Sequence, residues 1–309
     1  MQCSMPTVSF PRGIVPSMNT PFLENGSIDV QGLRRSADAV IAAGVSGMLV
    51  LAVAGETGSL TMEEKRLVAS TFLEQAAGRV PVVIGCSSAR QEDRVALAAM
   101  ARAMGAPDML CQIPPAESVA QLVALVQEIS AAGPERLMLQ DLDFGGPGLP
   151  LADILLLHRE VPAFQGLKIE VSMPGPKYSA VLQATQGGLH VSGGWAAAQM
   201  LEALHRGVHA FIPTAMDVIY VEVFRRFSAG DHAGARALHA ALTPVLAFSN
   251  QHIELSIRFF KHLRHREGLF ATPLCRLGVG VLDAHHQREL EINVEHVMEL
   301  QRRVQGGSA

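Results

Sequence analysis

Short apolar runs rich in Val, Ile and Leu recur along the chain, and longer segments with a helical spacing of apolar residues separate them. Each run is bounded by Gly or Pro, and its apolar residues are continuous, whereas a half-exposed strand would alternate them with polar ones. Parallel strands that are covered on both faces have this pattern. The predicted strands span residues 13–16, 47–52, 82–86, 109–113, 137–140, 166–169, 189–192 and 210–213.

Helices are predicted between the strands and after the last one. The helix after the second strand has a clear start, because Thr61 is followed three residues later by Glu64, the spacing of a capping box. The helices between strands are predicted at residues 29–43, 62–77, 89–104, 118–132, 151–160, 177–185 and 195–206. Those after the eighth strand are predicted at residues 216–228, 231–246, 249–266 and 286–304.

Successive strand–helix units of this kind predict an α/β fold, a (β/α)8 TIM barrel with additional C-terminal helices. A doubly wound sheet is the alternative, but no GxGxxG follows the first strand and the sequence has no P-loop. We expect an N-terminal extension at 1–12, the barrel at 13–228 and a C-terminal helical region packed on it at 229–305. The active site of such a barrel lies at the carboxyl ends of its strands.

Composition narrows the range of partners. The chain has 309 residues, is 49% hydrophobic and has a net charge of −4, so it lacks the basic character of a nucleic-acid-binding protein. No apolar run is long enough to cross a bilayer, and the first 13 residues lack the pattern of a secretory signal. We expect a cytoplasmic protein without nucleic-acid or membrane partners. The basic cluster at 258–266 is expected to form a solvated helix face or a subunit contact.

The cysteines give no sign of a metal site. The four of them form no CxxC pair and have no histidine at ligand spacing, so we expect reduced thiols, no bound metal and no cofactor. A metal-dependent barrel aldolase is a weaker hypothesis, because the predicted strand ends carry no cluster of His and carboxylate ligands.

One lysine stands out by its position. The chain has 25 Lys and Arg residues, and only four of them are lysines. Lys65, Lys177 and Lys261 lie in polar segments, where a solvated position is expected. Lys168 instead lies in the apolar strand FQGLKIEV, on the opposite face from its two apolar neighbours.

Burial among apolar groups destabilises an ammonium ion, and the neutral amine is the form that attacks a carbonyl to give a Schiff base. Lys168 is therefore a candidate nucleophile. The alternative is a buried ion pair with Glu170, two residues along the same face, because lysine is rarely buried without such a partner. The residues alone leave both interpretations open.

With Lys168 on the sixth strand, the chain resembles the dihydrodipicolinate synthase/N-acetylneuraminate lyase family of class I aldolases over about residues 12–282. The resemblance rests on the order of several motifs. They are GIVPSMNTPFLENGSIDVQGL, LAVAGETGSLTMEEKRLV, GLKIE, HVSGGW and FSAGDHAGARALH. It implies a homotetramer or homodimer in which the lysine condenses with pyruvate or a pyruvate-derived 2-keto acid.

The resemblance also implies how the substrate is held. The turn after the second strand binds the substrate carboxylate through backbone N–H groups and hydroxyls, which places Val53 and Ala54 in the site. The ends of the fifth and seventh strands add Gln140 and Gly193 as expected substrate-binding residues. Val53 and Ala54 stand where the family has two threonines, so the N–H donors remain but the hydroxyls are lost. Each lost hydrogen bond weakens binding by roughly 1 kcal/mol.

The family's catalytic tyrosine at the end of the fourth strand is also absent, because that stretch reads MLCQIPPAES. Dihydrodipicolinate formation is therefore not expected, and another group must move protons. Asp141, at the end of the fifth strand, is the predicted catalytic general base, and its alternative role is to cap or order the loop DLDFGGPG. Gln112 is a candidate substrate-orienting donor or a loop anchor, whereas His190 is expected to be structural.

The leading hypothesis is thus a Schiff-base-forming carbon–carbon or carbon–oxygen lyase. The alternative is a non-catalytic or hydratase-type barrel that binds a small keto acid, which the loss of the two threonines and the tyrosine motivates.

Overall fold

The computed structural model describes residues 10–277 and 282–307. Its strands alternate with helices in the predicted order, and every predicted strand is present within a few residues of its expected bounds. The strands are β1 (Gly13–Ile14), β2 (Met48–Val50), β3 (Val82–Gly85), β4 (Asp108–Gln112), β5 (Arg136–Asp143), β6 (Phe164–Val171), β7 (His190–Gly193) and β8 (Ala210–Phe211).

The predicted helices are also present, with two differences. The helices that alternate with strands are α1 (Val30–Ala42), α2 (Met62–Ala76), α3 (Gln91–Ala103), α4 (Val119–Ala132), α5 (Leu151–Glu160), α6 (Pro174–Ala184) and α7 (Met200–His205). Those after β8 are α8 (Asp217–Ser228), α9 (His232–Ala240), α10 (Thr243–Ser249), α11 (Ile253–Arg266) and α12 (Ala284–Gln305).

The first difference is that the helix predicted at 231–246 is two helices, α9 and α10. Pro244 lies in the first turn of α10, where a proline fits the start of a helix but not its interior. The second difference is that α7 starts late, because a short 3-10 turn at Trp195–Ala197 precedes it. Trp195 and Ala197 have positive φ angles in this turn, so it cannot continue into a regular helix.

The chain divides into two compact units, which are described separately. Among the described residues, unit 1 holds 10–12 and 82–211, and unit 2 holds 13–81 and 212–307. The predicted division into an extension, a barrel and a helical region stays a prediction, and residues 1–9 of the extension lie outside the described residues.

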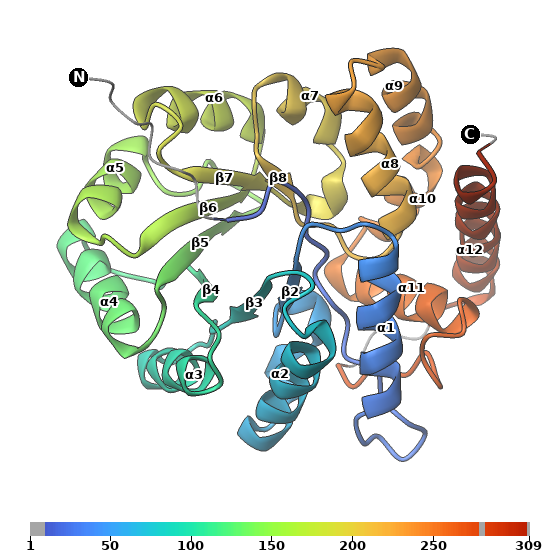
Figure 1. Cartoon of the computed structure of the whole chain (residues 1–309), viewed down its shortest axis with the longest axis horizontal. Coiled ribbons are helices and arrows are strands. Elements are labelled where there is room, and N and C mark those ends of the chain that lie inside the picture. The colour runs from blue at the N-terminus through green and yellow to red at the C-terminus, as the bar shows by residue number, and fades with distance from the viewer. Residues whose placement is uncertain (1–9, 278–281, 308–309) are drawn as a thin grey trace. The chain divides into compact units, whose positions relative to one another are not determined.

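Unit 1 contains the parallel strands β3 to β8, and each is paired with the next one along the chain. Figure 1 shows α3 to α6 following one another around the outer side of β4 to β7. Nearly every residue of β3, β4, β6 and β7 is buried, whichever face of the strand it is on, which explains the continuous apolar sequence of these strands. The pairing aligns one residue from each of four strands in a row, and this row consists of Gln112, Gln140, Lys168 and Ser192.

Unit 2 contains β1 and β2 and the helices α1, α2 and α8 to α12. The chain after β1 runs parallel to β2, and the N–H of Leu49 donates to the carbonyl of Pro16 at 2.9 Å. The predicted capping box starts α2, because the Thr61 side chain accepts from the N–H of Glu64 and the Glu64 carboxylate accepts from the N–H of Thr61.

The basic cluster at 258–266 departs from its expected solvated position. Lys261 and Arg264 of α11 are buried, and each is paired with a carboxylate of unit 2. Arg264 bonds to Asp217 at 2.5 Å and to Glu267 at 3.1 Å. The charges on this face of α11 are therefore neutralised inside the unit, and the expectation of a wholly solvated face was wrong.

Between residues 10 and 277 and between 282 and 307, no helix is both long enough and apolar enough to cross a membrane.

Candidate active site

Lys168 lies in the middle of β6 and is 5% exposed. The residues on both sides of it, Leu167 and Ile169, are fully buried on the other face of the strand. Its register partners are Gln140 on β5 and Ser192 on β7. A charged side chain that is buried between two neighbouring strands, away from bulk water, needs a polar partner to be stable there.

Glu170 is that partner. Its Oε2 lies 2.9 Å from Nζ of Lys168, and both side chains are buried. Oε2 also accepts a hydrogen bond from the amide of Gln140, and Oε1 accepts one from the backbone N–H of Trp195 at 2.7 Å. Burial alone would raise the pKa of Glu170, but the charge of Lys168 and these donors together hold it below its usual value. The carboxylate is thus ionised at neutral pH.

The sequence left two interpretations of Lys168 open, a nucleophile and a buried ion pair with Glu170. The structure has the ion pair, and the role of Lys168 as a nucleophile stays a prediction. A carboxylate within ion-pair distance favours an ammonium ion. Any reaction that needs the free amine must therefore first move a proton from Nζ, and Glu170 is the group in contact with it.

Asp141 follows Gln140 on β5 and points to the opposite face of the strand from it. Its carboxylate forms an ion pair with Lys177 of α6 and accepts hydrogen bonds from the N–H of Leu149 at 3.1 and 3.2 Å. Nζ of Lys177 also donates to the carbonyl of Pro147 at 2.7 Å. These contacts match the alternative role of Asp141, which is to order the loop after β5, and Lys177 is not the solvated residue that was expected.

The other predicted site residues of unit 1 differ in how close they come to the pair. The side-chain amide of Gln140 donates a hydrogen bond to the Glu170 carboxylate, which is one member of the pair. Gln112 lies in the same row, one strand further away, and its backbone N–H is held by the hydroxyl of Ser87 at 2.8 Å. Gly193 ends β7 in a tight space, because a side chain there would collide with the ring of Phe211 and the hydroxyl of Tyr178.

Three contributors to this region were not singled out from the sequence. Ser192 is fully buried beside Lys168, and its hydroxyl lies 3.6 Å from the sulfur of Met138. The Trp195 N–H reaches Glu170 only because Gly194 has no side chain, since a Cβ there would overlap the carboxylate. The motif HVSGGW contains all three residues, but without the strand register nothing showed that they face the lysine strand.

The two tyrosines of the chain, Tyr178 and Tyr220, are both buried. The hydroxyl of Tyr178 donates to the carbonyl of Ile169 at 3.2 Å, and burial raises its pKa. Tyr220 is fully buried on α8, and its pKa is also raised by burial. His190 contacts the carbonyl of Pro11 at 3.1 Å and the ring of Phe10, as expected for a structural residue.

The predicted carboxylate-binding turn belongs to unit 2. Residues Val53–Gly55 form a 3-10 turn, and the side chains of Asn19 and Thr20 hold its carbonyls. Asn19 donates to the carbonyl of Ala54 at 2.7 Å and Thr20 to that of Gly55 at 2.8 Å. Within the described chain, the N–H groups of Val53 and Ala54 donate no hydrogen bond, so the two predicted donors remain available for an anion.

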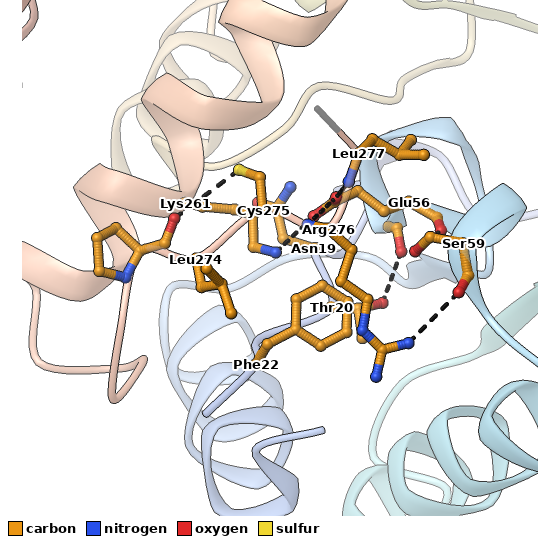
Figure 2. A network of polar contacts seen from close by, with 12 residues as sticks. Asn19, Thr20, Phe22, Glu56, Ser59, Lys261, Leu274, Cys275, Arg276 and Leu277 are labelled. Atoms are coloured by element: carbon orange, nitrogen blue, oxygen red, sulfur yellow. Dashed lines mark hydrogen bonds and ion pairs between the residues drawn. The ribbon is translucent and has the colours of Figure 1, made fainter. Parts of the chain in front are cut away.

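Glu56 anchors the end of this turn from inside unit 2 (Figure 2). Its carboxylate pairs with Lys261 at 2.5 Å and accepts from the N–H groups of Arg276 and Leu277, both at 2.7 Å. Both side chains of the ion pair are fully buried. Glu56 therefore bonds to the backbone of the segment after α11 and not to that of its own turn. The cations of Lys261 and Arg276 both lie over the ring of Phe22, 4.1 and 4.2 Å from its centre.

Between 10–277 and 282–307, no group of three or more His, Cys, Asp or Glu side chains is arranged to hold a metal ion.

The strands are parallel and alternate with helices, and further helices follow the last strand. This arrangement is that of a (β/α)8 protein with extra C-terminal helices, and Lys168 lies buried on one of its strands. Comparison with solved structures agrees, because a 4-hydroxy-tetrahydrodipicolinate synthase from Methylacidiphilum fumariolicum SolV has the same fold. The two superpose with a TM-score of 0.85 at 21% identity, over 96% of this chain and 98% of that one.

The chain belongs to the dihydrodipicolinate synthetase family, whose profile matches residues 10–297. A 4-hydroxy-tetrahydrodipicolinate synthase from Salinibacter ruber is 31% identical over 76% of this chain and 79% of its own length. An L-2-keto-3-deoxyarabonate dehydratase from Azospirillum brasilense is 28% identical over 84% of this chain and 86% of its own length. The expected family and fold are confirmed.

Proposed function

We propose that the protein is a class I lyase whose Lys168 forms a Schiff base with pyruvate or a pyruvate-derived 2-keto acid. The observation that carries the proposal is a lysine amine inside a buried strand, 2.9 Å from an ionised carboxylate, in a chain of the dihydrodipicolinate synthetase family. The departures from the family pattern at Val53, Ala54 and the fourth strand argue against the synthase reaction itself.

The reaction begins with addition of the Lys168 amine to the C2 carbonyl carbon of the keto acid. The resulting carbinolamine loses its hydroxyl as water and leaves an iminium ion, so the charge of the original ammonium is conserved. In a carbon–carbon lyase, the iminium accepts the electron pair of the C3–C4 bond, while the C4 hydroxyl loses its proton to a base and an aldehyde leaves. The proton returns to C3 of the enamine, and hydrolysis releases pyruvate and the lysine.

Glu170 is proposed as the group that moves the first protons. It is ionised and in contact with Nζ, so it can accept the proton that blocks the amine. The same proton can then go to the carbinolamine hydroxyl, which leaves as water. Gln140 and the Trp195 N–H hold the carboxylate in place during both transfers. Glu170 would thus take over proton transfer in a chain that lacks the family's tyrosine.

The carboxylate of the substrate is proposed to bind the free N–H groups of Val53 and Ala54, which stays a prediction.

A second form of the reaction breaks a carbon–oxygen bond in place of a carbon–carbon bond. The similarity to a keto-deoxy sugar acid dehydratase supports this second form. Here the iminium makes the C3 proton acidic, and the C4 hydroxyl leaves as water. Assembly as a homodimer or homotetramer also stays a prediction.

The test is turnover of a panel of 4-hydroxy-2-keto acids by the purified chain, followed through release of pyruvate. Lys168→Arg keeps the charge beside Glu170 but cannot form the Schiff base, so the variant should fold and lose turnover. Lys65→Arg, at the start of α2, is the matched control and should keep full activity. Full turnover by Lys168→Arg would overturn the proposal. Loss of water from the substrate without pyruvate release would assign the carbon–oxygen variant.

A further inference from the structure

Large apolar side chains are exposed where β5, β6 and β7 end. Phe144 follows β5 and is 50% exposed, and Met173 follows β6 and is 81% exposed. Leu142, near the end of β5, is also exposed. Trp195 follows β7 and is partly exposed. These side chains belong to three adjacent strands of unit 1, and exposed apolar groups gathered in one place mark a surface for binding.

Two of these side chains form a contact that is fixed to the lysine pair. The rings of Phe144 and Trp195 lie edge to face with their centres 4.3 Å apart. The backbone N–H of Trp195 donates to Oε1 of Glu170 at 2.7 Å, and the other oxygen of that carboxylate contacts Nζ of Lys168. The backbone of Trp195, whose ring contacts Phe144, is thus linked to the amine through a single carboxylate group.

The charged groups of the same strand ends are already used within the chain. Asp141 is paired with Lys177, and Asp143 accepts from the N–H of Gly148 at 3.1 Å. Glu170 is paired with Lys168. A polyhydroxylated substrate needs free donors and acceptors to replace its hydration. The exposed side chains at these strand ends are aromatic and aliphatic, so they present an apolar surface to a substrate.

We propose that the substrate of Lys168 carries an aromatic group that packs against Phe144 and Trp195. This inference rests on the proposed function, because it assigns a substrate class to the same amine. The exposed ring of Phe144 and the partly exposed ring of Trp195 can contact an incoming ring by stacking or edge to face. The aromatic pair would then select arylated 2-keto acids over sugar-derived ones.

The experiment measures the concentration of keto acid that gives half-maximal borohydride trapping on the full chain. The probes are pyruvate, 2-oxo-4-phenylbutanoate and a 2-keto-3-deoxy sugar acid. The phenyl compound should reach half-maximal trapping at a concentration at least about tenfold below that of the other two. Phe144→Ser should remove most of that advantage and leave trapping of pyruvate unchanged. Leu67→Ala, an exposed apolar residue of α2, is the matched control and should change nothing.

The outcomes separate this inference from the proposed function. Trapping of pyruvate with no preference for the phenyl compound would overturn the aromatic assignment alone. No trapping of any probe would overturn the Schiff base and the inference with it. Because Trp195 is the only tryptophan, its fluorescence gives a second readout. Saturable quenching of this fluorescence by 2-oxo-4-phenylbutanoate should occur in Lys168→Arg as well. Its absence there would contradict a contact between the phenyl ring of the compound and the ring of Trp195.

Discussion

A lysine and a glutamate two positions apart on one strand face can be a structural pair or a catalytic one, and their partners help to distinguish the two. Glu170 accepts hydrogen bonds from Gln140 and from the Trp195 N–H in addition to its contact with Lys168. A lone structural pair needs only mutual neutralisation. A carboxylate held by two further donors keeps its position and its charge when the lysine becomes an imine, which is what the proposed chemistry requires.

Glu170→Gln tests this role directly. The substitution keeps the size and the contact to the Trp195 N–H but removes the proton acceptor, so the rate of Schiff base formation should fall by about 10²-fold or more. The pKa of Glu170 lies below its usual value, so the wild-type rate should decrease only at acid pH, as the carboxylate becomes protonated. The variant should lose this acid limb of the pH–rate profile.

Equal trapping rates for Glu170→Gln and wild type at all pH values would assign Glu170 a purely structural role. Asp141→Asn is the matched control for a buried carboxylate. It should lower stability through the loop after β5 and leave the pH profile of trapping unchanged.

His190 gives a prediction about stability. Burial, together with neighbouring His209, lowers its pKa to about 3, from about 6.5 for a free imidazole. Because the folded pKa is the lower one, the unfolded chain binds more protons below about pH 6.5. Stability is therefore retained above that pH and lost as the pH falls towards 3. The contribution of this one residue is up to about 1.4 kcal/mol per pH unit.

Urea unfolding of His190→Gln between about pH 6.5 and pH 4.5 measures that contribution. The slope of its unfolding free energy against pH should be smaller than that of wild type by up to about 1.4 kcal/mol per unit. His285→Gln, an exposed residue of α12, should give the wild-type slope. If the curves for His190→Gln and wild type run parallel, the histidine does not titrate on unfolding.

At the scale of elements, the strands could be predicted because both of their faces are buried, which makes their sequences uniformly apolar. Their ends were predicted less well. The core of β6 was expected at 166–169, and the strand spans Phe164–Val171, so Glu170 lies within it on the same face as Lys168. β5 likewise extends through Asp141 to Asp143. The alternation of faces along β5 turns Asp141 away from Lys168, and this could be derived only once the strand was known to continue.

Helix α11 shows a second limit of prediction from sequence. Its basic residues were expected in solvent because charged runs usually are, but Lys261 and Arg264 have carboxylate partners more than 40 positions away in the chain. The sequence around a basic residue does not indicate an ion-pair partner that is so far away in the chain.

Breaking the Lys261–Glu56 pair should destabilise the protein. Lys261→Met leaves the Glu56 carboxylate buried without its cation, which costs about 3–5 kcal/mol of unfolding free energy. The double variant Glu56→Gln with Lys261→Met removes both charges and should recover part of that loss. Lys65→Met provides the control and should stay within about 0.5 kcal/mol of wild type. Equal stability of Lys261→Met and wild type in urea unfolding would show that the buried pair contributes nothing.

At the scale of the whole molecule, the alternation of strands and helices and the order of motifs were enough to predict the fold and the family. Both are properties of many positions at once, so single substitutions do not obscure them. The site is decided by a few positions, and the resemblance implies that this chain departs from the family pattern there, at Val53, Ala54 and the fourth strand. The proposed chemistry therefore depends on Lys168 and its immediate contacts more than on resemblance.

The most direct test of that chemistry is borohydride reduction of the chain in the presence of pyruvate, followed by peptide mapping by mass spectrometry. Hydride addition to the iminium carbon would leave a stable carboxyethyl group on the amine. The group is predicted on the peptide that contains Lys168, and it should be absent from that peptide in Lys168→Arg. A reduced adduct found only on Lys65, Lys177 or Lys261, or no adduct with pyruvate at any concentration, would contradict the account.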